Sequence, residues 1–166
     1  GQPPSAITAT GGVISDYTDP GSGNIYRAHI FTQTGSFVVS SLATGAIPNN
    51  VDYLVVAGGG GGGGAPSAAG GRGGGGAGGL RSSHPDVPSP NRGSAFTVSA
   101  GPTTYTITVG AGGANGTTSS ETDATRGGNS SVAGPDITTI ATSGGGAGGE
   151  ANPLKAGGSG AGPGGA

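Results

Sequence analysis

The sequence predicts an all-β fold, a sandwich of the jelly-roll type whose glycine-rich insertions pack as extended polyglycine II helices. Three observations support this prediction. Apolar residues are grouped in short blocks, in which β-branched and aromatic side chains alternate with polar ones as in half-buried strands. No segment keeps its apolar residues at helical spacing, so essentially no α-helix is expected. Long glycine tracts follow directly after predicted strands, which indicates that the tracts belong to the folded structure.

The first segment, residues 1–25, is rich in Gly, Pro, Ser and Asp and is expected to be a loose N-terminal arm. A glycine-rich β-sandwich domain is expected over residues 26–166. It opens with a strand over Tyr26–Phe31, and a second strand begins at Phe37. The turn residues Gln33–Ser36 lie between these strands, so a β-hairpin is the simplest connection.

The next predicted strand is Val51–Val56, and its unbroken apolar end, Tyr53–Val56, indicates burial on both faces. Residues 80–92 then form a polar, proline-containing excursion. The clearest alternation in the chain is Thr104–Val109, which predicts a half-buried strand with its threonines facing solvent. Further short strands are predicted at Phe96–Val98, Ser130–Val132 and Ile137–Thr142.

The predicted core is small for a chain of 166 residues. It consists of the large apolar residues of these strands: Ile30, Phe37, Val39, Leu54, Val56, Phe96, Tyr105, Ile107 and Val109. Such a core buries little apolar area to offset the entropy lost on folding, so we expect the chain to self-associate.

Glycine accounts for 42 of the residues, and ordering it is costly because Gly loses more conformational freedom on folding than any other residue. In an extended left-handed helix with three residues per turn, the N–H and C=O groups point sideways and can bond to neighbouring helices that only Gly allows close enough. Collagen is excluded, because Gly58–Gly64 and the run Gly70–Gly73, interrupted at Arg72, break its frame of Gly at every third position. Flexible glycine linkers without a fold are the competing interpretation.

Composition excludes several functional classes. The chain has no Cys, so it has no disulfide framework, zinc knuckle or thiol nucleophile. Six Lys and Arg against eight Asp and Glu give a net charge of −2, which argues against nucleic-acid binding by counterion release. No apolar run approaches the ~20 residues of a membrane span, so no membrane insertion is expected.

The sequence contains no candidate catalytic machinery. It has no Gly-x-Ser-x-Gly elbow and no Gly-Lys-Ser/Thr triplet, and no helix-forming sequence follows its glycine runs. His29 and His84 lie far apart in the chain and are interpreted as ordinary histidines. Two acidic pairs in turn-rich loops are interpreted as solvated turn residues: Asp16 with Asp19, and Glu121 with Asp123. We therefore expect no enzyme activity, no catalytic residues, no metal site and no cofactor.

Several segments resemble known proteins in sequence and order: "HIFTQTGSFVV", "VDYLVVAGGGGGGG", "GGRGGGGAGGLR", "FTVSAGPTTYTITVGAGG" and "GGNSSVAG…TIATSGGGAGG". They are similar to the glycine-rich-domain proteins of bacteriophages, which are commonly tail-fibre, adhesin or other virion appendage proteins. The layout also resembles the glycine-rich region of anaplastic-lymphoma-kinase-type receptors, where a TNF-like β-sandwich carries a bundle of polyglycine helices. The resemblance implies a homo-trimer or higher assembly, and its pattern would normally continue past Ala166.

The resemblance implies a structural role as a virion fibre or adhesin module that presents a rigid tip to a bacterial surface receptor. The location would be the virion surface or the extracellular space. The glycine tracts would hold two loops, residues 80–92 and 117–126, and the residues expected to contact a receptor are Arg81, His84 and Arg92. A self-assembling extracellular filament subunit is the alternative function.

Overall fold

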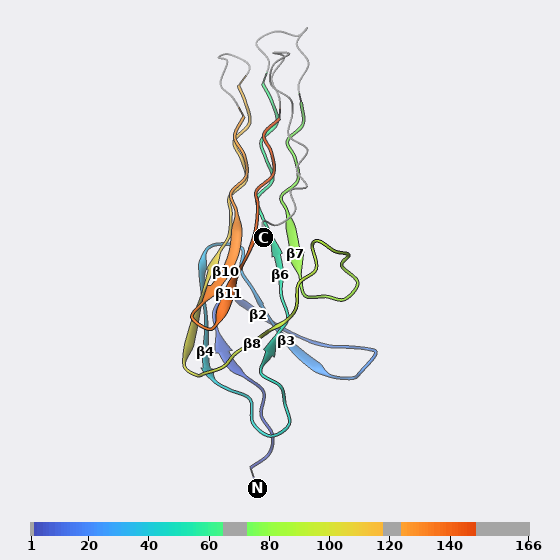
Figure 1. Ribbon diagram of the computed structural model, residues 1–166, viewed down its shortest axis with the longest axis vertical. Coiled ribbons are helices and arrows are strands. Elements are labelled where there is room, and N and C mark those ends of the chain that lie inside the picture. The colour runs from blue at the N-terminus through green and yellow to red at the C-terminus, as the bar shows by residue number, and fades with distance from the viewer. Residues whose placement is uncertain (1, 65–72, 118–123, 149–166) are drawn as a thin grey trace. The chain divides into compact units, whose positions relative to one another are not determined.

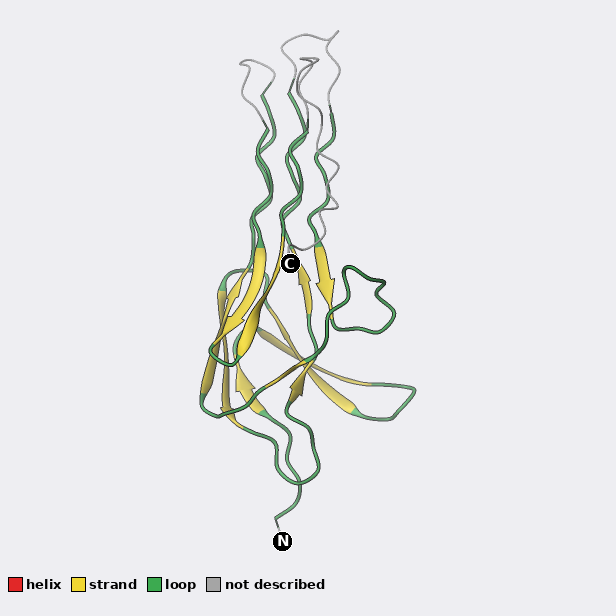
Figure 2. Ribbon diagram, viewed as in Figure 1, coloured by secondary structure: helices red, strands yellow, loops and turns green. Residues whose placement is uncertain are grey.

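The computed structural model describes residues 2–64, 73–117 and 124–148, and every regular element in these ranges is a β-strand (Figure 2). The all-β prediction is confirmed. None of the described segments forms a helix of the length and hydropathy needed to span a membrane. The chain divides into two compact units, described separately below: residues 1–51, 95–108 and 132–139, and residues 52–94, 109–131 and 140–166.

The first unit is built on a five-stranded sheet in the order β1-β4-β9-β10-β11 (Figure 1). These strands are β1 (Thr8–Thr10), β4 (Gly35–Ser41), β9 (Thr103–Thr108), β10 (Ser130–Gly134) and β11 (Ile137–Thr142). Strand β4 pairs antiparallel with both β1 and β9. The alternation predicted for β9 is confirmed, because Tyr105 is buried while Thr104 and Thr106 on either side of it are exposed.

Two small sheets complete this unit: β2 (Val13–Thr18) pairs with β3 (Ile25–Ile30), and β5 (Asn50–Val51) pairs with β8 (Phe96–Thr97). The expected hairpin between Tyr26–Phe31 and the strand at Phe37 is therefore wrong, because β3 pairs with β2 instead. The connection between β2 and β3 is closed locally by Asp19, whose carboxylate accepts the backbone N–H groups of the two residues Gly21 and Ser22, each at 3.1 Å.

The segment expected to be a loose arm, residues 1–25, contains strands β1 and β2. The turn between them uses Gly11 and Gly12, whose φ angles of 111° and 66° lie in the left-handed region that favours glycine. His29 Nδ1 lies 2.8 Å from the carbonyl oxygen of Gly11 and ties this turn to β3. The turn residues that indicated a loose arm thus connect β1, which pairs with β4, to β2, which pairs with β3.

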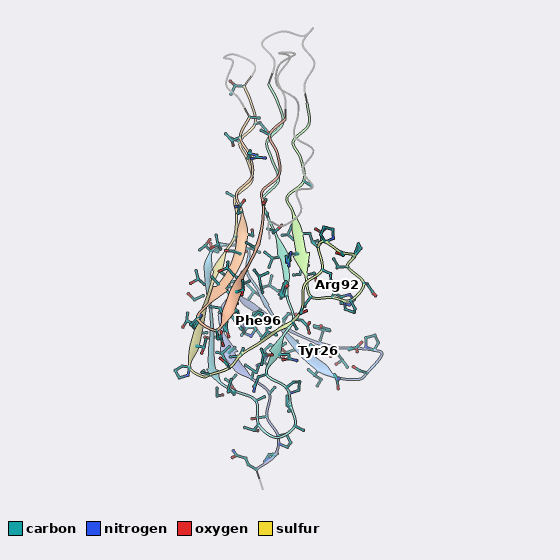
Figure 3. The ribbon with its side chains drawn as sticks, viewed as in Figure 1. Tyr26, Arg92 and Phe96 are labelled. Atoms are coloured by element: carbon teal, nitrogen blue, oxygen red, sulfur yellow. The ribbon has the colours of Figure 1, made fainter. Side chains whose placement is uncertain are left out.

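The core of the first unit lies between the five-stranded sheet and β8, in a sandwich-like arrangement (Figure 3). Tyr105 is fully buried at its centre, with its ring centroid 5.9 Å from that of Phe37 and 5.1 Å from that of Phe96. The predicted core is confirmed at Phe37, Val39, Phe96 and Tyr105, and Ile107 and Val109 are partly buried. The prediction missed Val98 and Val132 in this unit and Val55 in the second unit, all of which are buried.

The core prediction was wrong for Ile30 and for two residues of β6 (Leu54–Val56), which pairs antiparallel with β7 (Leu80–Ser82) in the second unit. The expected strand Val51–Val56 is interrupted, and only Val55 within β6 is buried. Side chains alternate between the faces of a strand, so a sheet covered on one face leaves Leu54 and Val56 exposed.

Asp136, in the turn between β10 and β11, joins three elements of the first unit. Its Oδ2 accepts hydrogen bonds from Ser99 N at 2.9 Å, Ser99 Oγ at 2.8 Å and the Tyr105 hydroxyl at 3.1 Å. These bonds, the Ser99 amide above all, hold the pKa of Asp136 below its ordinary value of 3.8. Burial of the Tyr105 phenol, together with its bond to Asp136, raises the pKa of Tyr105.

Asp136 is expected to make folding stability fall in acid. Its pKa is lower in the folded chain than in the unfolded chain, so its contribution is present above the unfolded value near 3.8 and is lost as the pH falls through the folded value. Asp136→Asn is therefore expected to reduce the loss of stability between about pH 5 and pH 2. Urea unfolding across this range measures the effect. An acid dependence identical to that of the wild type would contradict the assignment, and the exposed Asp86→Asn serves as the control.

Candidate functional site

Among the described residues of the second unit, five glycine-rich stretches run beside one another (Figure 1). We number them in chain order as tract 1 (57–64), tract 2 (73–79), tract 3 (110–117), tract 4 (124–129) and tract 5 (143–148). Strand β6 leads directly into tract 1, and tract 2 leads directly into β7. The predicted coupling of glycine tracts to strands is therefore present in the structure.

Backbone hydrogen bonds between the tracts recur at every third residue. Tracts 1 and 2 are antiparallel, joined by bonds from the amides of Ala57, Gly60 and Gly63 to the carbonyls of Gly79, Gly76 and Gly73, at 2.8–2.9 Å. Tracts 1 and 3 are parallel, joined by bonds from the amides of Gly113 and Gly116 to the carbonyls of Gly59 and Gly62, at 2.8 and 2.9 Å. Each tract thus presents the same orientation again after three residues.

Tract 1 is bonded to each of the other four tracts. Its Gly58 and Gly61 donate to the carbonyls of Gly128 and Thr125 in tract 4, and their own carbonyls accept from Gly145 and Gly148 in tract 5. The outer tracts are also bonded to one another: Gly76 and Gly79 donate to Gly146 and Ser143, Gly127 donates to Gly145, and Thr125 and Gly128 donate to Ala114 and Ala111. Tracts 2, 5, 4 and 3 therefore follow one another around tract 1.

Where a glycine faces another tract closely, the contact leaves no room for a side chain. A Cβ atom at Gly60 would overlap the carbonyl oxygen of Gly146, and a Cβ atom at Gly61 would overlap that of Ala114. Alanine occurs within the tracts at the exposed residues Ala77 and Ala111, and at the tract ends Ala57 and Ala124, which are buried. The positions of glycine are thus set by the approach of one backbone to another.

Side chains at the ends of tracts supply acceptors that the backbone does not. They accept amide hydrogens as follows: Asn115 Oδ1 from Gly62 at 2.9 Å, Thr125 Oγ1 from Ala114 at 2.7 Å, Asn129 Oδ1 from Gly144 at 3.0 Å and Ser130 Oγ from Gly110 at 2.9 Å. These acceptors were not predicted from the sequence, although a short polar residue beside a glycine run was the available signal. Thr125 falls within the loop expected over 117–126. Residues 118–123 of that loop lie outside the described residues, and Thr125 belongs to the bundle.

Ser130→Ala is expected to lower the free energy of unfolding by about 1–3 kcal/mol, because the Gly110 amide loses its acceptor at a buried side chain. The exposed Ser94→Ala is the matched control and is expected to stay within about 0.5 kcal/mol of the wild type. Urea unfolding of the three proteins measures the difference, and equal stabilities would argue against the acceptor role of Ser130.

The loop over residues 83–92, which follows β7, carries two of the predicted receptor contacts. Its base is closed by hydrogen bonds from the Ser82 amide to the Asn91 carbonyl at 3.1 Å and from the Gly93 amide to the Ser82 carbonyl at 2.8 Å. Within the loop, Arg92 Nη1 donates to the Pro85 carbonyl at 2.8 Å (Figure 3). Arg92 thus helps to shape the loop.

The two remaining predicted receptor contacts, His84 and Arg81, differ in exposure. The His84 side chain is 65% exposed, and its Nδ1 accepts the Asp86 amide at 3.3 Å. Arg81 is partly buried on β7, opposite Val55 of β6. The structure therefore places His84 and Arg92 on one loop and Arg81 on the strand before it.

The comparison with protein families matches a glycine-rich domain over residues 32–166. This range begins just before β4 and includes all five tracts and the loop after β7. No curated protein and no solved structure is significantly similar to the chain. The match covers most of the chain, and the chain belongs to the glycine-rich domain family.

Proposed function

We propose that this protein is a non-enzymatic structural module of a virion fibre or adhesin, located on the virion surface or outside the cell. Its role is to present a rigid tip for attachment to a host surface. The observation that carries the proposal is the three-residue register of backbone hydrogen bonds between the tracts. A stretch of glycine bonded in this way is a scaffold, because each lateral bond restrains backbone that would otherwise be the most flexible in the chain.

In this proposal the tracts are polyglycine II helices. Such a helix has three residues per turn and no internal hydrogen bonds, so its orientation repeats every third residue and its amides must find partners outside it. The amides of Ala57, Gly60 and Gly63 follow this rule. Ordering the backbone costs about 1–2 kcal/mol per residue, and the lateral bonds supply the compensation that side chains cannot.

In this proposal the first unit is a TNF-like jelly-roll sandwich. Antiparallel pairing of β4 with β1 and β9, and a core between that sheet and β8, support this assignment. The resemblance of the sequence to phage appendage proteins supports the biological setting, since the fold alone does not determine function.

The loop over residues 83–92 is the surface that we assign to receptor contact. It is tied at its base to β7, and its backbone carries further internal bonds, from Val87 to His84 and from Asn91 to Pro88, both at 3.1 Å. A loop held in this way keeps its shape through its own backbone bonds. The His84 side chain is exposed on this loop. Its imidazole ring is both aromatic and polar, which suits contact with a polar bacterial surface.

A self-assembling filament subunit is the second candidate function, and one observation favours it. The β2–β3 hairpin exposes Val13, Tyr17, Tyr26 and Ile30 on one face, and the rings of Tyr17 and Tyr26 stack with centroids 5.4 Å apart (Figure 3). An exposed apolar face of this kind is typical of contacts between subunits.

His84→Ala is expected to weaken attachment of the labelled protein to bacterial cells by about 5- to 30-fold, because a contact residue at the centre of a small interface carries about 1–2 kcal/mol. The variant particles should look the same as the wild type in electron micrographs. Ser94→Ala is the control. Discrete particles that bind cells support the attachment role, whereas long helical polymers that do not bind cells would favour the filament.

A further inference from the structure

We propose that the open side of the glycine bundle binds a second copy of this chain, so that copies associate through their tracts. The inference rests on the proposed polyglycine II arrangement. It adds to that proposal the surface, the kind of partner and the polarity of the contact.

Six rows of main-chain groups extend from tract 1, three of amides and three of carbonyls, because its orientation repeats every third residue. Four rows are bonded to other tracts: the amides of Ala57, Gly60 and Gly63 to tract 2, the amides of Gly58 and Gly61 to tract 4, the carbonyls of Gly59 and Gly62 to tract 3, and the carbonyls of Gly58 and Gly61 to tract 5. Among the described residues, one row of amides and one row of carbonyls make no main-chain bond to another tract.

The amide row without a main-chain acceptor consists of Gly59 and Gly62. The Gly62 amide donates to Asn115 Oδ1, where a side chain replaces a main-chain carbonyl, and the Gly59 amide has no hydrogen-bond partner among the described residues. The open carbonyl row includes Gly60 and Gly63, which likewise accept no hydrogen bond from the part of the chain that the structure describes. One open row therefore needs acceptors and the other needs donors.

Both open rows lie on the same side of tract 1. Tracts 2, 5, 4 and 3 are bonded in that order around it, which leaves a gap between tracts 3 and 2 among the described residues. A Cβ atom at Gly62 would lie 3.8 Å from Asn115 Oδ1 on tract 3 and 3.9 Å from the Gly73 carbonyl oxygen on tract 2, within this gap. The two open directions are thus adjacent.

Glycine is retained in this gap although a larger residue would fit. A Cβ atom at Gly59 would meet its nearest neighbour, the Gly76 carbonyl oxygen, at 3.7 Å, an ordinary contact. Alanine restricts the unfolded chain more than glycine does and is present at other outward positions, such as Ala77 and Ala111. Glycine at Gly59 is required only if another backbone approaches there.

An exposed apolar patch lies on the strands that adjoin tracts 1 and 2, β6 and β7. Val56, Gly59 and Gly62 are three residues apart, and Val56 lies directly opposite Leu80 in the β6–β7 pair. Leu54 is on the same face as Val56 because it is two residues away in the strand. Leu54, Val56 and Leu80 are 65%, 52% and 36% exposed. A partner must therefore offer glycine backbone beside the gap and apolar side chains beside this patch.

A second copy of the chain meets both requirements, because β6 followed by tract 1 has apolar residues and glycines in that order. The polarity of the open rows determines the kind of contact. A two-fold axis would set amides against amides or carbonyls against carbonyls, whereas a head-to-tail contact sets the amide row of one copy against the carbonyl row of the next. Since the open directions are adjacent, three copies of tract 1 around one axis form the smallest ring, and an open series is the other form.

The test is the mass of the full-length protein by light scattering over a range of concentrations. The wild type and Gly74→Ala, whose added Cβ would meet no atom within 4 Å, are expected to form assemblies of three or more copies. Gly59→Ala and Val56→Glu, each at an exposed position, are expected to give monomers. A wild type that stays monomeric or stops at a dimer would overturn the proposal, as would a Gly59→Ala and a Val56→Glu variant that both assemble like the wild type.

Amide exchange separates this proposal from the polyglycine II arrangement on which it rests. In the monomeric variants the amides of Gly60 and Gly76, which bond within one copy, are expected to stay protected. Loss of their protection in a protein that still assembles would reject the bundle and not the association. Retained protection in a wild type that never assembles would reject the association and leave the bundle in place.

Discussion

Gly60→Ala is expected to lower the free energy of unfolding by about 3 kcal/mol or more. The added Cβ would overlap the carbonyl oxygen and carbon of Gly146 in tract 5, and both atoms belong to backbone that cannot rotate away. The Gly60 amide also donates to Gly76, so any shift that relieves the overlap stretches this bond. Overpacking of an ordinary core costs about 1–3 kcal/mol, and the cost here is at the upper end or beyond because no side chain can yield.

Gly74→Ala is the matched control for this prediction. Gly74 is exposed, and a Cβ atom added there would have no atom within 4 Å. The substitution is expected to leave the stability unchanged or to raise it by about 0.4–1 kcal/mol through the lower entropy of the unfolded chain. Urea unfolding of both variants provides the comparison. If the two alanines had the same effect, close approach between tracts would not explain the glycine content.

Tyr105→Ala is expected to cost about 3–5 kcal/mol in the first unit. Tyr105 is fully buried, its ring packs against Phe37 and Phe96, and Gly134 lies so close that a Cβ atom there would overlap the ring. Removing the ring leaves a cavity in a core with few other large side chains. Its hydroxyl also bonds to Asp136, so the substitution removes a link between β9 and the β10–β11 turn.

Tyr105→Phe separates the two contributions of this residue. It keeps the ring and removes the bond to Asp136, so it is expected to cost about 0.5–1.5 kcal/mol. Tyr17→Ala, on the exposed face of the β2–β3 hairpin, is expected to cost about 1 kcal/mol or less. Thermal unfolding followed by tyrosine fluorescence ranks the variants. A Tyr105→Ala protein as stable as Tyr17→Ala would show that the core lies elsewhere.

The parts of the fold that sequence could predict are those governed by local pattern. The alternation of Thr104–Val109 predicted β9 and its buried Tyr105, because side chains alternate in a strand wherever it pairs. Glycine runs placed directly after apolar blocks predicted the continuity of β6 with tract 1. Phe37 and Phe96 were identified as core residues because large aromatic side chains are rarely left in water.

Strand partners and the exposure of individual faces could not be predicted, because both depend on contacts distant in sequence. A turn between Tyr26–Phe31 and Phe37 was compatible with a hairpin, yet β3 pairs with β2 through the turn that Asp19 closes. The apolar run of β6 gave no sign that one face of its two-stranded sheet is uncovered. The pattern of apolar residues in the sequence does not distinguish a strand buried on both faces from a strand with one exposed apolar face.

The candidate site shows the same division. The composition of residues 80–92 predicted a loop; the prediction was wrong for Leu80–Ser82, which form β7, and His84 lies exposed on the loop that follows. The role of Arg92 in bonding to Pro85, and that of Ser130 and Asn115 as acceptors for glycine amides, depend on distances that no spacing in the sequence reveals. These side chains form hydrogen bonds with backbone groups that would otherwise be unpaired. Their roles can be recognised only once the three-dimensional arrangement of the neighbouring segments is known.

Hydrogen–deuterium exchange resolved to single glycine amides distinguishes a laterally bonded glycine bundle from solvated glycine linkers. Slow exchange is expected at the amides of Gly60, Gly76 and Gly113, each of which donates to a carbonyl of another tract at 2.8 Å. Fast exchange is expected at Gly74, an exposed residue whose amide has no partner among the described residues. Uniformly fast exchange at all four positions would contradict a laterally bonded glycine scaffold.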